Sequence, residues 1–86
     1  MDFRDGNIVL SKAGRDKGRY FVVLNVIDDN FVLIADGDLR KVDNPKKKKI
    51  KHLENTGKTS DWICKKLEEG IRVTNPDLKR ELADLD

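Results

Sequence analysis

Cysteine and histidine are almost absent, since the 86 residues contain one of each, Cys64 and His52. A single cysteine excludes an intramolecular disulfide, and one cysteine with one histidine cannot form a zinc site of the usual kind. Cys64 also lacks a histidine near it in the sequence, so a thiol nucleophile has no base beside it. We therefore expect no metal, no cofactor and no enzymatic activity.

Long apolar runs are also lacking. The longest, residues 20–27, is interrupted by Asn25 and is far too short to span a bilayer. Residues 1–6 include acids and have no apolar run behind them, so no signal peptide is predicted. Together with the missing disulfide, these features predict a soluble, cytoplasmic monomer without a membrane partner.

Charge is plentiful, because charged residues make up 40% of the chain and apolar residues only 37%. The formal net charge of +2 is unevenly spread. Residues 1–56 carry twelve Lys or Arg against nine Asp or Glu, whereas residues 57–86 carry six against seven. The densest positive segment is Arg40–Lys51, where seven cations face one acid, Asp43. The positive charge therefore belongs to the first two-thirds of the chain.

The first two-thirds also has the pattern of short strands separated by turn residues. Strands are predicted over residues 7–11, 20–27, 31–35, 39–42 and 50–53, with Lys46–Lys49 as an extended run before the last. The turn signals between them are Asp28-Asp29-Asn30, Asp36-Gly37 and Asn44-Pro45. Five short strands in about fifty residues favour a small β-barrel over residues 1–56.

Residues 57–86 change to helical periodicity. One helix is expected after a Thr59 or Ser60 cap, with Trp62, Ile63 and Leu67 on its apolar face. A second begins at Asn75 as cap, with Pro76 in the first helical position. Its apolar stripe is Leu78, Leu82 and Leu85. Both helices are too short to be stable alone, so we expect them to dock on the barrel, on each other or on a partner.

Two basic features suggest phosphate binding, the loop Lys12–Arg19 and the tract Arg40–Lys51. Gly14 and Gly18 would let the loop backbone approach a ligand closely. The candidate phosphate contacts are Lys12, Arg15, Lys17, Arg19, Arg40, Lys41, Lys46, Lys47, Lys48, Lys49 and Lys51. The alternative is a solvated hairpin connection and a solvated lysine linker, and the sequence does not establish that the two features meet.

Two ring side chains could add stacking contacts to an unpaired base. Tyr20 is expected at the loop edge and Phe21 in the core, because adjacent strand residues face opposite sides. His52, beside Lys51, could touch phosphate or stack, and a partly buried strand histidine is an equal alternative.

The segment GNIVLSKAGRDKGR at residues 6–19 resembles the strand, basic loop and glycine of the KOW motif. DGDLRKV at residues 36–42, NPKKK at 44–48 and KHL at 51–53 extend the resemblance. This second half is similar to KOW-type ribosomal proteins of the archaeal and eukaryotic large subunit, and closer still to small bacterial KOW-domain RNA-binding proteins. The resemblance implies an SH3-like barrel whose first loop contacts RNA, often ribosomal RNA.

The sequence therefore favours a non-catalytic RNA-binding module, ribosome- or rRNA-associated, followed by a helical extension at residues 57–86. KOW domains also occur in transcription elongation factors, so the alternative is an adaptor that binds a protein of the ribosome or RNA polymerase. In that alternative the partner-binding residues are Trp62, Leu78, Leu82 and Leu85. Non-specific DNA binding is a third hypothesis.

Overall fold

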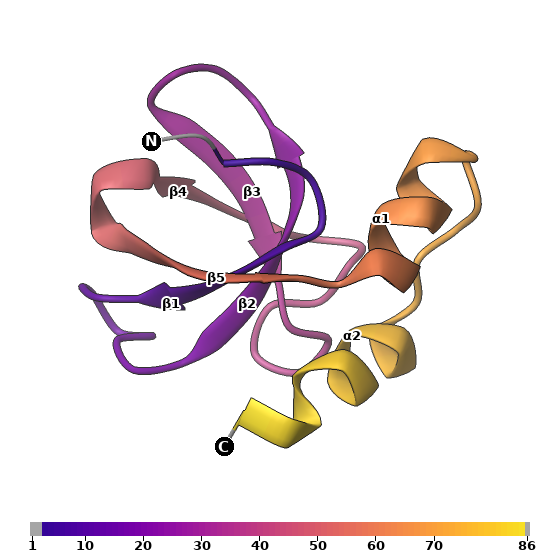
Figure 1. Cartoon of the computed structure of the whole chain (residues 1–86). Helices are drawn as coiled ribbons and strands as arrows, with labels where there is room; N and C mark the ends of the chain where they lie inside the picture. Colours follow the sequence, from indigo (N-terminus) through magenta and orange to yellow (C-terminus); the bar gives the residue numbers. More distant parts are fainter. Residues whose placement is uncertain (1–2, 86) are drawn as a thin grey trace.

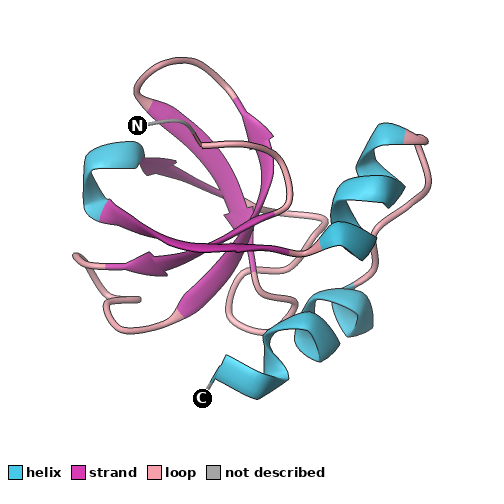
Figure 2. Ribbon diagram, in the orientation of Figure 1, coloured by secondary structure: helices cyan, strands magenta, loops and turns pink. Residues whose placement is uncertain are grey.

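The computed structural model describes residues 3–85. Five strands come first: β1 (Asn7–Ser11), β2 (Tyr20–Val26), β3 (Phe31–Ala35), β4 (Lys46–Lys49) and β5 (Leu53–Thr59). The short 3-10 helix η1 (Ile50–His52) lies between β4 and β5. The helices α1 (Asp61–Glu68), α2 (Asn75–Leu82) and the 3-10 turn η2 (Ala83–Leu85) follow. Figures 1 and 2 show these helices packed together on one side of the strands.

The strands form one antiparallel sheet in the order β4-β3-β2-β1-β5. Among the described residues no ladder joins β4 to β5, so the sheet is open and resembles a barrel only loosely. The mainly β fold with five strands and two C-terminal helices is thus confirmed, whereas a closed barrel is not. The boundary expected at residues 56 and 57 falls inside β5.

Both faces of the sheet are buried. Alternate residues of a strand point to opposite faces, so Phe21 and Val23 enter one core and Val22 enters another. In β1, Val9 faces the first core and Ile8 the second. This arrangement explains the continuous apolar run of residues 20–24, whose side chains enter the two cores alternately, whereas Asn25 and Ile27 beyond them are exposed.

The helices form the cover of the second core. Ile63 of α1 and Leu78 of α2 are fully buried there against Val22 and Ala35. Each such side chain contributes roughly 1.5–3 kcal/mol when removed from water. Helices of this length gain little stability from local propensity, so this packing is what holds them.

Both helices begin at a capping residue that is the predicted one or lies next to it. Ser60 caps α1 by accepting a hydrogen bond from the N–H of Ile63 at 3.2 Å. Thr74, not Asn75 as expected, caps α2, and it forms a reciprocal capping box with Asp77. Asn75 is instead the first helical residue, and its side-chain oxygen accepts from the N–H of Val42 at 2.8 Å.

The prediction of a strand at residues 39–42 is wrong, because backbone N–H groups of this segment donate to side chains and not to a neighbouring strand. The carboxylate of Asp36 accepts hydrogen bonds from the N–H groups of Asp38 and Arg40, at 3.0 and 2.8 Å, and closes a turn. Lys46–Lys49 is the actual fourth strand, and it pairs with β3 from Ile34↔Lys46 to Phe31↔Lys49. The strand expected at residues 50–53 is also wrong, since η1 occupies Ile50–His52.

Among residues 3–85, no helix has the length and apolar character needed to cross a bilayer.

Candidate nucleic-acid interface

The loop between β1 and β2 is folded into consecutive turns. The N–H of Gly18 donates to the carbonyl of Ser11 at 2.8 Å, and the N–H of Ser11 donates to the carbonyl of Arg19 at 3.0 Å. Gly14 adopts a φ of 84°, a left-handed conformation that favours glycine. The backbone therefore gives the loop a defined shape before any ligand binds.

A buried ionic cluster fastens this loop to β4. The carboxylate of Asp16, with 1% of the residue exposed, accepts from the Lys48 ammonium at 3.1 Å and from the Ser11 hydroxyl at 3.3 Å. The same ammonium donates to the carbonyl of Ala13 at 2.9 Å. Arg40 approaches the second carboxylate oxygen to 3.6 Å. The structure thus brings together the loop and the lysine tract, which sequence reasoning could not do.

Asp16 is ionised within this cluster. Burial alone would raise the pKa of Asp16, but the hydrogen bond and charge of Lys48, with the charge of Arg40, outweigh it and hold the pKa below its ordinary value of 3.8. Among residues 3–85, Oδ2 of Asp16 and Nε of Arg40 form an ion pair without a hydrogen bond. The cluster is therefore strongly charge-stabilised but incompletely hydrogen-bonded.

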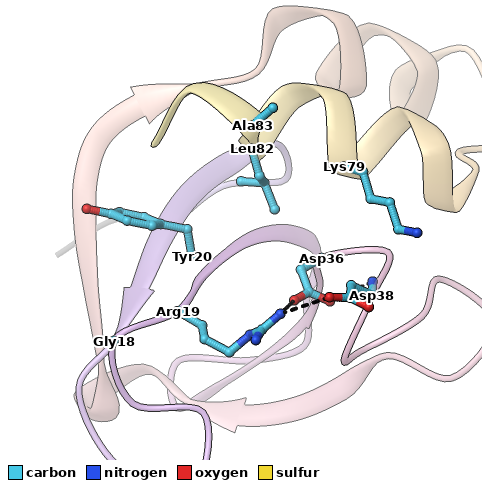
Figure 3. A pocket seen from close by; sticks show the side chains of 8 residues that line it. All are labelled: Gly18, Arg19, Tyr20, Asp36, Asp38, Lys79, Leu82 and Ala83. Carbon is cyan, nitrogen blue, oxygen red and sulfur yellow. Dashed lines mark hydrogen bonds and ion pairs between the residues drawn. The ribbon is translucent and has the colours of Figure 1, made fainter. Parts of the chain in front are cut away.

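Arg19 is held by two acids of the turn that follows β3. Its guanidinium donates to Asp36 at 3.0 Å and to Asp38 at 3.3 Å, as the dashed lines in Figure 3 show. The hydrogen bond to Asp36 raises the pKa of Arg19 above its ordinary value. Arg19 thus serves first to fix the loop against this turn.

A hollow of about 540 Å³ opens beside this ion pair. Its lining residues are Gly18, Arg19, Tyr20, Asp36, Asp38, Lys79, Leu82 and Ala83. Figure 3 shows the Tyr20 ring at one side of this hollow, with its hydroxyl pointing away from the acids. The two acids offset the two cations of the lining, so the hollow has no excess positive charge with which to attract an anion.

The remaining basic residues of the two features lie on the loop, β4 and η1, three segments that are joined by contacts with one another. We call this set the basic edge: Lys12, Arg15 and Lys17 of the loop, Lys46, Lys47 and Lys49 of β4, and Lys51 with His52 of η1. The N–H of Lys12 donates to the carbonyl of His52 at 2.9 Å, which joins the loop to η1. In Figure 1 the loop and η1 lie at the left, and α1 and α2 lie at the right.

Most side chains of the basic edge are exposed, with Lys46 and His52 half-buried. Within the described part of the chain none of them forms an ion pair with an acid. Lys47 lies over the ring of Phe31, 4.5 Å from its centroid. Lys41 is exposed as well, in the turn next to Arg40. The lysines and the arginine of this set therefore have no counterion within the described residues and are open to an external anion.

Three predicted phosphate contacts have internal roles. Lys48, at 8% exposure, is paired with Asp16, which leaves its ammonium little surface for an external phosphate. Arg40 is half-buried beside the same acid, and Arg19 is bound to Asp36 and Asp38. Sequence reasoning overlooked Asp16 itself. The signal was an isolated acid among the four cations of the loop.

The predicted partner-binding residues pack within this chain. Leu78 is fully buried and Leu82 is 8% exposed in the second core, and Leu85 packs against it, so the leucine stripe is not an open surface. Trp62 is half-buried, and Lys66 and Arg80 lie 4.6 and 4.2 Å from its ring centroid. The helices thus use their apolar stripe to complete the fold.

The chain is similar in sequence to proteins of the large ribosomal subunit. No protein-family model matches it. It is 41% identical over 54 residues to the large ribosomal subunit protein eL14 of Desulfurococcus amylolyticus, which covers 63% of this chain and 56% of that protein. The eL14 protein of Staphylothermus marinus is 36% identical over 56 residues, covering 65% of this chain and 58% of that protein. The chain thus spans somewhat more than half the length of these curated relatives.

The expected similarity to an archaeal large-subunit ribosomal protein is confirmed over about 55 residues. The closer resemblance to small bacterial KOW-domain proteins stays a prediction.

Proposed function

We propose that this chain is a non-catalytic RNA-binding module associated with the ribosome, and that its basic edge contacts the phosphate backbone of folded RNA. The observation that carries the proposal is the basic edge itself. Its lysines and arginine come from three segments that the Asp16–Lys48 pair and the Lys12–His52 backbone hydrogen bond join, and within residues 3–85 none of them forms an ion pair with an acid. Lysine and arginine side chains in such a set bind phosphate and release its counterions.

Two further observations support the proposal. The loop is already shaped by its internal turns and by the Asp16–Lys48 pair, so little ordering entropy opposes binding. The two relatives are proteins of the large ribosomal subunit, which is built on RNA. The adaptor alternative loses its main argument, because Leu78 and Leu82 are buried in this chain.

Binding to a structured RNA across a salt series tests the proposal. We expect Lys12, Arg15 and Lys17 changed together to Gln to weaken binding at least ten-fold and to reduce the slope of log K against log salt by about 2, since each lost phosphate contact removes roughly 0.7–0.9 from the slope. The matched control changes Lys58, Lys65 and Arg72 to Gln, three exposed cations outside the basic edge. Absence of RNA binding, or an equal slope change in both triple variants, contradicts the proposal.

A further inference from the structure

A second hollow, of about 450 Å³, adjoins the basic edge at the tip of the β2–β3 hairpin. Its lining residues are Asp29, Asn30, Phe31, Lys49, Ile50 and Lys51. We propose that this hollow receives one unpaired nucleotide of the bound RNA, with the base against Phe31 and the phosphate on Lys49 and Lys51. The inference rests on the proposed RNA-binding function and adds to it a preference for RNA with an unpaired nucleotide.

The hollow offers an apolar surface to a base. Phe31 is half-buried at the start of β3, so part of its ring is accessible from the hollow. Ile50 packs against the first core and contributes a second apolar side chain. Unpaired bases stack on aromatic rings whatever their identity, because every base has a flat π-face. An apolar surface with one accessible ring is therefore suited to a base rather than to a paired duplex.

The same hollow carries positive charge for the phosphate. Lys49 and Lys51 are exposed, and neither is paired with an acid in the described part of the chain. Lys47, over the Phe31 ring at 4.5 Å, adds a third cation nearby, and Asp29 is the one acid of the lining. This excess of positive charge distinguishes it from the hollow in Figure 3, where Asp36 and Asp38 balance the cations.

The walls of the hollow are fixed by the backbone. The N–H of Ile50 donates to the carbonyl of Asn30 at 2.8 Å, which joins η1 to the hairpin. The carboxylate of Asp28 accepts from the N–H groups of Asn30 and Phe31 at 2.8 and 2.9 Å. A site shaped in advance loses less entropy on binding. η1, which contributes Ile50 and Lys51 to the hollow, continues to His52, whose carbonyl accepts a hydrogen bond from the N–H of Lys12, so η1 links the hollow to the loop of the basic edge.

The experiment compares two RNA hairpins that differ by a single unpaired nucleotide in an otherwise paired stem. We expect the wild-type protein to bind the bulged hairpin about ten-fold more tightly, which corresponds to one stacked base. Phe31→Leu should abolish this preference and leave affinity for the fully paired hairpin unchanged. Trp62→Leu is the matched control, because it removes a half-buried aromatic residue of α1 that lies outside this hollow and outside the basic edge, and it should keep the preference.

A second measurement does not depend on any variant folding correctly. In the wild-type complex, nuclear Overhauser contacts should join base protons of the unpaired nucleotide to ring protons of Phe31. Equal affinity for the two hairpins, or a bulged complex without these contacts, overturns the inference while RNA binding itself stands. If neither hairpin binds, the proposed function fails and this inference fails with it.

Discussion

Asp16 is the one acid in a loop that also contains Lys12, Arg15, Lys17 and Arg19. Its burial could not be predicted from the sequence, because it depends on Lys48, which lies 32 residues further along the chain. A carboxylate in a basic loop suggests local charge balance at the surface, whereas here it binds the strand that carries the lysine tract. The one acid of the loop, whose charge opposes phosphate binding, thus joins the loop to Lys48 and Arg40.

Asp16→Asn should lower the free energy of unfolding by about 2 kcal/mol near neutral pH, because it leaves the buried Lys48 ammonium without its counterion. Urea denaturation followed by circular dichroism measures this difference. Asp38→Asn is the control, since Asp38 is 70% exposed beside Arg19 and its pair should contribute at most about 1 kcal/mol.

Measuring the free energy of unfolding of wild type and Asp16→Asn at several pH values tests whether Asp16 is ionised. Because the pKa of Asp16 is lowered in the folded state, its contribution is fully present above the ordinary value of 3.8 and is lost as the pH falls through the lower folded-state pKa. The difference between wild type and Asp16→Asn should therefore shrink below about pH 4. Asp77 also has a lowered pKa, but it is present in both proteins and cancels. A difference that stays constant down to pH 2 would contradict an ionised Asp16.

At the scale of elements, the strand boundaries that depend on local turn chemistry were predictable. The pattern predicted β1 and β3 with their observed bounds, and β2 with one residue too many. The lysine run was not recognised as a strand, because its hydrogen bonds come from β3 rather than from its own propensity. The predicted strand at residues 39–42 failed because Asp36 and Asn75 bind its N–H groups.

The turn after β3 and the start of α2 approach each other closely at Gly37. Its φ is 80°, and a Cβ there would lie 2.3 Å from the carbonyl oxygen of Asn75. Gly37→Ala should therefore cost more than about 2 kcal/mol, from left-handed strain together with a backbone clash. The control is Gly57→Ala, which has a φ of 82° and open space around it, so about 1 kcal/mol of strain is expected. Equal losses in thermal unfolding of the two variants would refute the close approach.

At the scale of the whole molecule, the sheet and the helices form one folding unit. The second core contains Ile8 and Val22 from the sheet and Ile63 and Leu78 from the helices. The sequence indicated short helices that need a docking surface, and it indicated an apolar strand run. The sequence could not show that the helices pack on the second core of this sheet. Short amphipathic helices and an apolar strand run are equally expected in a chain whose helices dock on another protein.

A fragment containing only residues 1–59 should therefore fail to unfold cooperatively. Removing the helices exposes Ile8, Val22 and Ala35, and it deletes side chains worth roughly 1.5–3 kcal/mol each, in total comparable with the whole stability of a small domain. Thermal unfolding and proton–nitrogen NMR spectra measure this, with the full chain as reference. Dispersed amide signals and a sharp transition in the fragment would show that the sheet folds alone.

The position of β4 at the end of the ladder has a consequence for how copies of this chain behave in solution. An open sheet edge is a template for pairing with another chain and for aggregation. If two copies joined along β4, lysines of one strand would lie against lysines of the other, and their repulsion opposes growth of an extended sheet. The exposed lysines of this strand, Lys47 and Lys49, thus oppose self-assembly, and a bound polyanion that neutralises them also removes that opposition.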